Sequence, residues 1–230
     1  MQQAYQALRV VSEAQTVYIV LAAQPGELIL EELSAACAGL QDKSSSGIKA
    51  VVLDFDQQPE AQNATRSIAP DLLTHACESV RAIPQPALAI ARASLSDTAC
   101  WLYKEADFTL VAHEAELCLP GRDERDGWTD GDKRVGGLAA VRLGYATWTA
   151  PASDLNREME RILGMLRTKS AVALRNAKTS VRLAQQYAAA PQEALRRVNQ
   201  FYLENVMQTE DAREGLKAFL EKRQPRWSNR

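Results

Sequence analysis

Side chains that could act as nucleophiles or metal ligands are few in this sequence. They comprise four cysteines and two histidines: Cys37, Cys77, Cys100, Cys118, His75 and His113. No two cysteines form a C-x-x-C pair, and with only two histidines the sequence gives no support to a Cys/His zinc site, so we predict no metal centre. Free cysteine is among the most buried residue types, and we therefore expect four reduced thiols in the core.

Motifs that would indicate nucleotide binding or hydrolase chemistry are absent from the sequence. It contains no G-x-x-x-x-G-K-[ST], no G-x-G-x-x-G and no G-x-S-x-G. The densest group of charges lies between Gly121 and Gly137, a stretch that is rich in glycine and has no hydrophobic period. This composition is typical of a surface loop.

The composition is that of a globular protein. The 230 residues are 46% apolar and 24% charged, and 27 basic against 29 acidic side chains leave a net charge of −2. A chain so close to neutral has no electrostatic footprint for nucleic acid or an anionic membrane, and we expect neither as a partner. The four cations of the C-terminal tail, Lys222, Arg223, Arg226 and Arg230, form a short basic stretch without interleaved aromatic repeats and do not change this expectation.

The N-terminus and the apolar runs indicate a cytoplasmic address. The first five residues lack the basic region and the long apolar core of a signal peptide. The longest apolar run, over 17–23, has the length of a strand and is far too short for a membrane helix.

Hydrophobic periodicity predicts an α/β core followed by helices. We expect a hairpin over 8–21, a helix over 30–40, a buried strand over 48–55, a polar loop over 57–70, a helix over 72–80, and strands over 87–91, 108–112 and 116–119. Helices follow: one after an N-cap at Ser153, one carrying Leu174, Ala177, Val181 and Ala184, one beginning at Pro191, and a last one through Leu220. Residues 1–150 and 151–230 are therefore assigned to the core and to a helical region of one domain.

Several segments resemble the crotonase superfamily, the enoyl-CoA hydratase/isomerase family. They are the strand over 48–55, the segment over 83–89 (IPQPALA), the stretch over 106–117 (ADFTLVAHEAEL), and the C-terminal run over 211–225, which is similar to the family signature D-x-x-E-G-x-x-A-F-x-x-K-R-x-P. The resemblance implies an α/β crotonase (ClpP/crotonase-like) fold of stacked ββα turns with a helical C-terminal trimerisation region, a homotrimer or hexamer, and coenzyme A thioesters as substrates or ligands, with no covalently bound cofactor. It also implies an oxyanion hole, in which two backbone N–H groups stabilise a thioester enolate.

The active-site loops depart from that family pattern. Aligned with the family loop N-G-x-x-x-G-x-G-x-E, the chain has Ala93, Asp97 and Ala99 in place of the glycines. Trp101 occupies the position of the first glutamate, and Gly121 occupies the position of the second. The first oxyanion loop has no counterpart within residues 54–70. The resemblance therefore predicts a divergent member with a degenerate site that does not use the usual two-glutamate mechanism.

Three residues are candidates for surrogate chemistry. Thr98, with Asp97, falls where the oxyanion turn would be, so the Thr98 N–H is a candidate donor; the alternative is a helix start capped by Ser96 or Asp97. Glu124, or Asp123 beside it, is a candidate base if the loop is shifted; the alternative is a solvated charge cluster. Trp101 is expected to fill the vacated acyl pocket.

Phe219 and Lys222 match positions that approach the adenine end of coenzyme A in the family. On a helix, residues three apart share a face, so the ring could stack on the base while the ammonium meets a phosphate. The alternative is a core phenylalanine and an unrelated surface lysine.

Two functional hypotheses follow. The first is an enoyl-CoA hydratase/isomerase-like protein that binds an acyl-CoA with weak or altered catalysis, a lyase or isomerase if it is active. The alternative is a non-catalytic structural subunit that assembles with an active relative in a hetero-oligomer. A cavity beside Thr98 would favour the first, and a site filled by Trp101 would favour the second.

Overall fold

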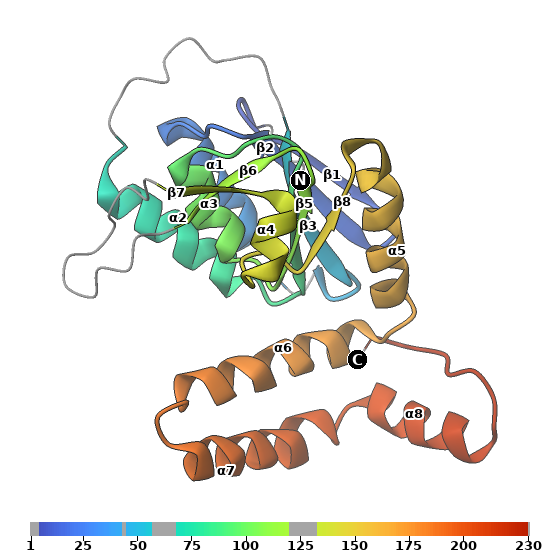
Figure 1. Ribbon diagram of the computed structural model, residues 1–230. Coiled ribbons are helices and arrows are strands. Elements are labelled where there is room, and N and C mark those ends of the chain that lie inside the picture. Colours follow the sequence, from blue (N-terminus) through green and yellow to red (C-terminus); the bar gives the residue numbers. More distant parts are fainter. Residues whose placement is uncertain (1–4, 43–44, 57–67, 120–132, 230) are drawn as a thin grey trace.

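The structure, a computed structural model, describes residues 5–42, 45–56, 68–119 and 133–229, and its centre is a six-stranded sheet with the order β1-β2-β3-β4-β5-β8 (Figure 1). The strands span Arg9–Glu13 (β1), Thr16–Ala22 (β2), Ala50–Asp56 (β3), Ala87–Ala91 (β4), Phe108–Ala112 (β5) and Trp148–Ala150 (β8). β1 runs antiparallel to β2, as the predicted hairpin requires, and all other neighbours are parallel.

Helices cross over between the parallel strands and bury them. α1 (Glu27–Gly39), α2 (Pro70–Ala82) and α3 (Asp97–Lys104) each connect one strand to the next, and Figure 1 shows them together on one side of the sheet, with α5 (Leu155–Arg167) on the other. Because both faces are covered, β4 is buried at every position and β3 at all but its last. These elements confirm the predicted α/β alternation.

Only one of the two strands of a second sheet was predicted. β6 (Glu116–Leu119) pairs antiparallel with β7 (Lys133–Gly136), which lies within the stretch predicted to be a surface loop. The short helix α4 (Gly137–Arg142) and β8 were also not predicted. Gly137 is fixed by close packing, since a Cβ there would collide with the carbonyl oxygen of Ala112.

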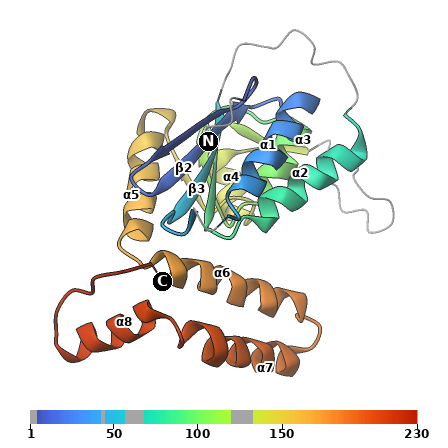
Figure 2. The same cartoon turned by 180° about the vertical axis from the view of Figure 1, so that it is seen from behind.

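The chain after β8 is helical, as predicted for residues 151–230. A 3₁₀ turn (Ala152–Asp154) leads into α5, followed by α6 (Ala171–Gln186), α7 (Pro191–Phe201), a π-helical turn (Tyr202–Val206) and α8 (Glu210–Leu220). In both views α6, α7 and α8 form a layer apart from the sheet (Figures 1 and 2). The prediction that Ser153 caps a helix was wrong, because Ser153 lies inside the 3₁₀ turn and α5 begins two residues later.

The inward face of α6 differs from the predicted stripe. Ala177 and Ala184 are exposed and Val181 is 57% exposed, whereas Ala171 and Lys178 are buried. The Lys178 ammonium of this helix reaches Asp107 at the start of β5. The buried face of α6 thus carries an ion pair with a residue far away in the sequence.

Eight of the fourteen large hydrophobic side chains that are exposed in the described residues lie between α6 and α8. The exposed large side chains of this layer are Val181, Leu195, Tyr202, Leu203, Met207, Leu216, Phe219 and Leu220. Among the helices of the described residues, none is long and apolar enough to span a membrane.

Candidate functional site

The start of α3 is the region where the resemblance places an oxyanion donor. Ser96 caps this helix, since its Oγ accepts a hydrogen bond from the Ala99 N–H at 3.3 Å and its carbonyl accepts one from the Cys100 N–H at 2.9 Å. The capped helix start is therefore confirmed, with Ser96 rather than Asp97 as the cap.

Thr98 is the second residue of α3, so its N–H belongs to the first turn, whose amides have no acceptor within the helix. The preceding turn is held in place by two backbone bonds, from the Ser96 N–H to Ala23 O at 3.1 Å and from the Leu95 N–H to Glu116 O at 3.0 Å. A fixed helix start with the positive end of its dipole suits a partial negative charge on a ligand oxygen. The cap formed by Ser96 therefore does not prevent the Thr98 N–H from donating a hydrogen bond to a ligand.

Two buried thiols lie beside this helix start. The Cys118 N–H donates to Cys100 Sγ at 3.0 Å, and both thiols lie near the carbonyl oxygen of Leu95. Burial, followed by a hydrogen bond with Asp97, raises the pKa of Cys118 to about 12, and burial also raises the pKa of Cys100. Both groups are therefore thiols at neutral pH and poor nucleophiles.

The other two cysteines are also free and buried. Burial raises the pKa values of Cys37 and Cys77 to about 12. The prediction of four reduced core thiols is confirmed.

An ion pair that the sequence analysis missed lies at the carboxyl ends of β3 and β4. Arg92 Nε lies 2.7 Å from Asp54 Oδ1, and Arg92 Nη2 lies 2.9 Å from Asp54 Oδ2, so the pair is bidentate. Asp54 is nearly buried, and its partner follows the neighbouring strand. The signal was present in the sequence, because a carboxylate inside an otherwise apolar strand requires a cation or several donors.

Trp101 lies one turn after Thr98 on α3 and is half-buried. The Lys104 ammonium lies 4.8 Å from the centroid of its ring, a cation–π contact. An indole at this place has neither an acidic proton near neutral pH nor a basic lone pair, so it cannot replace a glutamate in proton transfer. That Trp101 fills an acyl pocket stays a prediction.

The remaining loop candidates lie outside the described residues. These are Glu124, with Asp123 and Gly121, and most of the first loop. The catalytic role assigned to Glu124 stays a prediction.

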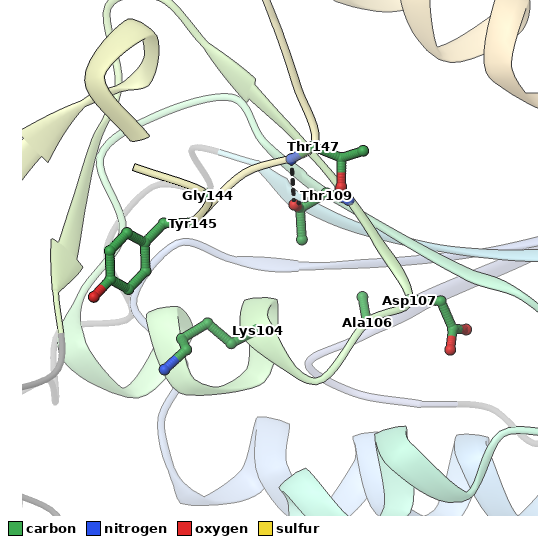
Figure 3. Close-up of a pocket in the computed structure, with 7 residues that line it drawn as sticks. All are labelled: Lys104, Ala106, Asp107, Thr109, Gly144, Tyr145 and Thr147. Atoms are coloured by element: carbon green, nitrogen blue, oxygen red, sulfur yellow. Dashed lines mark hydrogen bonds between the residues drawn. The ribbon is translucent and has the colours of Figure 1, made fainter. Parts of the chain in front are cut away.

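A pocket of about 340 Å³ lies at the opposite end of α3 from Thr98 (Figure 3). It is lined by Lys104, Ala106, Asp107, Thr109, Gly144, Tyr145 and Thr147. Thr109 and Thr147 are hydrogen-bonded to each other. The Thr109 N–H donates to Thr147 Oγ1 at 3.1 Å, and the Thr147 N–H donates to Thr109 Oγ1 at 2.9 Å. Asp107 is bound to Lys178, and Lys104 points away from Asp107 in Figure 3. The polar groups of this pocket do not converge on a common point, and it contains none of the predicted site residues.

Phe219 and Lys222 do not share a helix, which corrects the geometry predicted for them. α8 ends at Leu220, and Lys222 has a φ of +53°. The Lys222 N–H donates to Phe219 O at 3.2 Å and the Arg223 N–H to Ala218 O at 3.0 Å, the two bonds of a Schellman motif. Lys222 occupies the left-handed position where glycine is usual. Phe219 is 78% exposed, so it is not a core residue.

The C-terminal signature residues form a structural clasp, which we define as Asp211, Glu214, Arg223 and residues 226–229. Asp211, 3% exposed, accepts hydrogen bonds from the N–H and Oγ of Ser228 at 2.7 and 2.8 Å and from the Asn229 N–H at 2.9 Å. Glu214 accepts two from the Arg223 guanidinium at 2.6 and 2.9 Å and one from the Arg226 N–H at 2.7 Å.

The clasp ties the tail to the junction between α5 and α6. Trp227 Nε1 donates to Thr168 O at 2.9 Å, and Asn229 Oδ1 accepts from the Ala171 N–H at 2.9 Å, so the tail supplies a cap to α6. A buried lysine, Lys49, reaches the same junction and donates to Arg167 O at 2.7 Å. Every polar contact of the signature carboxylates named here stabilises the fold.

Asp107, in the segment over 106–117 that resembles the family, has a structural role of the same kind. One of its carboxylate oxygens accepts from the Ala87 N–H at 2.7 Å and lies 2.5 Å from the Lys178 ammonium. Lys178 also donates to Gln85 O at 2.9 Å. Burial lowers the pKa of Lys178, and the Asp107 carboxylate opposes that shift.

Metal ligands do not cluster in the described part of the chain: no three His, Cys, Asp or Glu side chains there could share an ion.

Comparison with known proteins identifies the fold. No protein-family model and no curated protein sequence matches the chain. Solved structures do match: an enoyl-CoA hydratase from Geobacillus kaustophilus HTA426 superposes with a TM-score of 0.82 at 18% identity over 99% of this chain and 98% of that one. An enoyl-CoA hydratase/isomerase from Mycobacterium paratuberculosis gives 0.79 at 17% over 99% and 100%. A putative enoyl-CoA hydratase from Streptomyces coelicolor A3(2) gives 0.77 at 20% over 100% and 97%. The chain therefore has the α/β fold of these proteins along nearly its whole length.

Proposed function

We propose that this protein is a divergent member of the crotonase superfamily that binds an acyl-CoA thioester and has lost efficient hydration. The observation that carries this proposal is the start of α3, where a capped helix presents the Thr98 N–H while Trp101 stands one turn later. The fold supports the ligand class, because the structures it matches include enoyl-CoA hydratases.

The chemistry of the site follows from what the residues can supply. A helix-start N–H can polarise a thioester carbonyl and stabilise charge that develops on its oxygen. Hydration also needs a group that positions water and moves a proton, which glutamates do in hydratases. Trp101 cannot do this, so the site retains binding and polarisation without the acid–base step.

Phe219 and Lys222 are the proposed contacts for the adenine end of coenzyme A. The exposed ring offers a stacking surface, and the Schellman turn that contains Lys222 follows Phe219 directly in the chain. Lys222 has a left-handed backbone, where glycine costs less, and such strain occurs at ligand-binding sites.

Calorimetric titration with acetyl-CoA tests the proposal. We expect saturable binding, and Phe219→Ala or Lys222→Gln should raise Kd by about tenfold, the loss of one stacking or charge-assisted contact. Lys217→Gln is the matched control, since Lys217 is an exposed lysine of α8, the helix that carries Phe219, and should leave Kd unchanged. Absence of any binding heat, with the fold intact by circular dichroism, would contradict the proposal.

The alternative function is a non-catalytic subunit that assembles with an active relative. The exposed apolar side chains of α6–α8 favour it, since exposed apolar patches mark protein–protein interaction sites. In this layer we propose a trimeric contact, with copies of this chain or with a relative. Purification from the native source followed by mass analysis distinguishes the two: a chain that binds no acetyl-CoA but co-purifies in defined stoichiometry with another crotonase-fold protein is the structural subunit.

A further inference from the structure

β1 is the outer strand of the six-stranded sheet and is unusually open. It pairs with β2 on one side, and no other strand of the described residues lies on its other side. All five of its residues are exposed, including Val10 at 38% and Val11 at 41%. In Figure 2 the hairpin, in dark blue, lies at the margin of the sheet.

The turn of the hairpin determines which backbone groups of β1 are unpaired. Ala14 and Gln15 have φ values of +46° and +62°, the signature of a two-residue type I′ turn. The residues that flank such a turn, Glu13 and Thr16, form a hydrogen-bonded pair, and bonded and non-bonded pairs then alternate. Glu13, Val11 and Arg9 are therefore bonded to β2, while Val10 and Ser12 direct their N–H and C=O groups outward.

This edge lacks several of the devices that usually protect an edge strand. The sequence Arg9–Glu13 (RVVSE) contains no proline and no lysine, and its register with β2 is continuous, without a bulge. An exposed edge with adjacent valines and free backbone groups is a site at which another strand can add.

We propose that β1 pairs antiparallel with β1 of a second copy of this chain, around a twofold axis at Val11. In this register Val10 and the second copy's Ser12 exchange backbone hydrogen bonds, and the symmetric pair does the same. On one face of the joined strands Arg9 lies opposite the second copy's Glu13, and Val11 lies opposite its own copy. These are non-hydrogen-bonded pairs, in which side chains approach most closely.

Charge selects this register from its neighbours. Two other antiparallel registers also join the free groups of Val10 and Ser12, one centred on each residue. The first places Arg9 opposite Val11, and the second places Glu13 opposite Val11, so neither pairs the two charges. Only the register centred on Val11 makes the five-residue strand complementary to itself.

The contact is small, so it should be weak by itself. Five residues a side bury far less than the roughly 800 Å² per partner of a stable dimer. We expect the oligomer that forms through the C-terminal helices to double its mass as the protein concentration rises. This inference does not depend on the proposed acyl-CoA function.

Sedimentation velocity on the full chain, from low to high micromolar concentration, tests the pairing. The wild-type mass should double across this range. Arg9→Glu or Glu13→Arg places like charges opposite each other twice and should weaken doubling by about tenfold, and the double swap Arg9→Glu with Glu13→Arg should restore it. Arg142→Glu, at an exposed residue of α4, is the control for the change in net charge, and this variant should double its mass as the wild type does.

Hydrogen exchange supplies a second readout that a folding defect would not imitate. The amides of Val10 and Ser12 should gain protection as concentration rises, while that of Val11, already bonded to β2, should not change. A wild-type mass that stays constant, or a double swap that does not restore doubling, overturns the proposal. Protection of Val10 and Ser12 at constant mass, only after a different protein is added, also overturns it and assigns the edge to a strand of that protein.

Discussion

The clasp and the start of α3 differ in how closely they follow the family pattern that the sequence resembles. In the clasp, the signature carboxylates Asp211 and Glu214 are present and each accepts three hydrogen bonds from the tail. At the start of α3, the resemblance aligns other residues with the loop glycines of the family and aligns Trp101 with a glutamate. The local backbone there is nevertheless a well-capped helix.

The difference shows which property of the protein the sequence resemblance predicts. Its most specific motif consists of residues that hold α8, the tail and the α5–α6 junction together, and Asp107 does the same for α6. None of these contacts touches the start of α3. A match in these residues therefore predicts the fold well, and it predicts the reaction poorly.

The largest effect should come from Lys178. Lys178→Ala leaves the Asp107 carboxylate without its cation and Gln85 O without its donor, and breaking a buried pair in this way costs about 3–5 kcal/mol. Lys104→Ala is the control. It removes a cation–π contact with Trp101 and should lower the free energy of unfolding by less than about 1 kcal/mol. Urea unfolding of both variants measures the difference, and equal losses would contradict the anchoring role of Lys178.

Asp211 should have the next largest effect. Asp211→Ala removes three hydrogen bonds from a buried carboxylate and should lower the free energy of unfolding by about 2–3 kcal/mol. It should also expose Trp227, which shifts tryptophan emission to longer wavelength. Glu31→Ala, at an exposed acidic residue of α1 outside the clasp, is the control, and a loss of similar size there would argue against the clasp.

Glu214 should make the clasp sensitive to acid. Hydrogen bonds from the Arg223 side chain and the Arg226 N–H lower the pKa of Glu214 from 4.5 to about 2. Because the folded-state pKa lies below the unfolded value, this stabilisation is complete above about pH 4.5 and is lost as the pH falls towards 2. Glu214→Gln should flatten the stability profile in that window, and a profile parallel to wild type would contradict this.

Lys222 should give the smallest effect, of opposite sign. Lys222→Gly relieves the left-handed backbone at φ +53° and should stabilise the protein by about 1 kcal/mol. The same change should weaken acetyl-CoA binding if Lys222 meets a phosphate. Stabilisation with unchanged affinity would leave Lys222 without a binding role.

Local patterns in the sequence were sufficient to predict most of the helices and strands. The apolar run over 48–55 marked a buried strand, and Pro191 marked the start of α7, both of which the structure contains. β7, α4 and β8 were missed because they have only four, six and three residues, too few to show a period. The burial of Lys178 on α6 was not predicted, because its partner Asp107 lies far away in the sequence.

The candidate site was predictable only where its contacts are local. The cap of α3 follows from Ser96 and its neighbours, and it was foreseen. The Arg92–Asp54 pair and the partners of Asp211 depend on which strands and tails are adjacent, and spacing does not specify this. The positive φ of Lys222 was unforeseen for another reason, since a lysine gives no sign of a left-handed backbone.

Hydration of crotonyl-CoA, followed as loss of the enoyl-thioester absorbance, tests the central claim most directly. The loss of one oxyanion donor typically costs 10²–10³ in rate and the loss of a general acid or base 10²–10⁴, so we expect turnover at least about a thousandfold below an active hydratase assayed in parallel. Trp101→Glu alone should not restore it, because the second glutamate position and the loop glycines remain changed. Wild-type turnover within about tenfold of the control would contradict the account and would make Glu124 the first residue to replace.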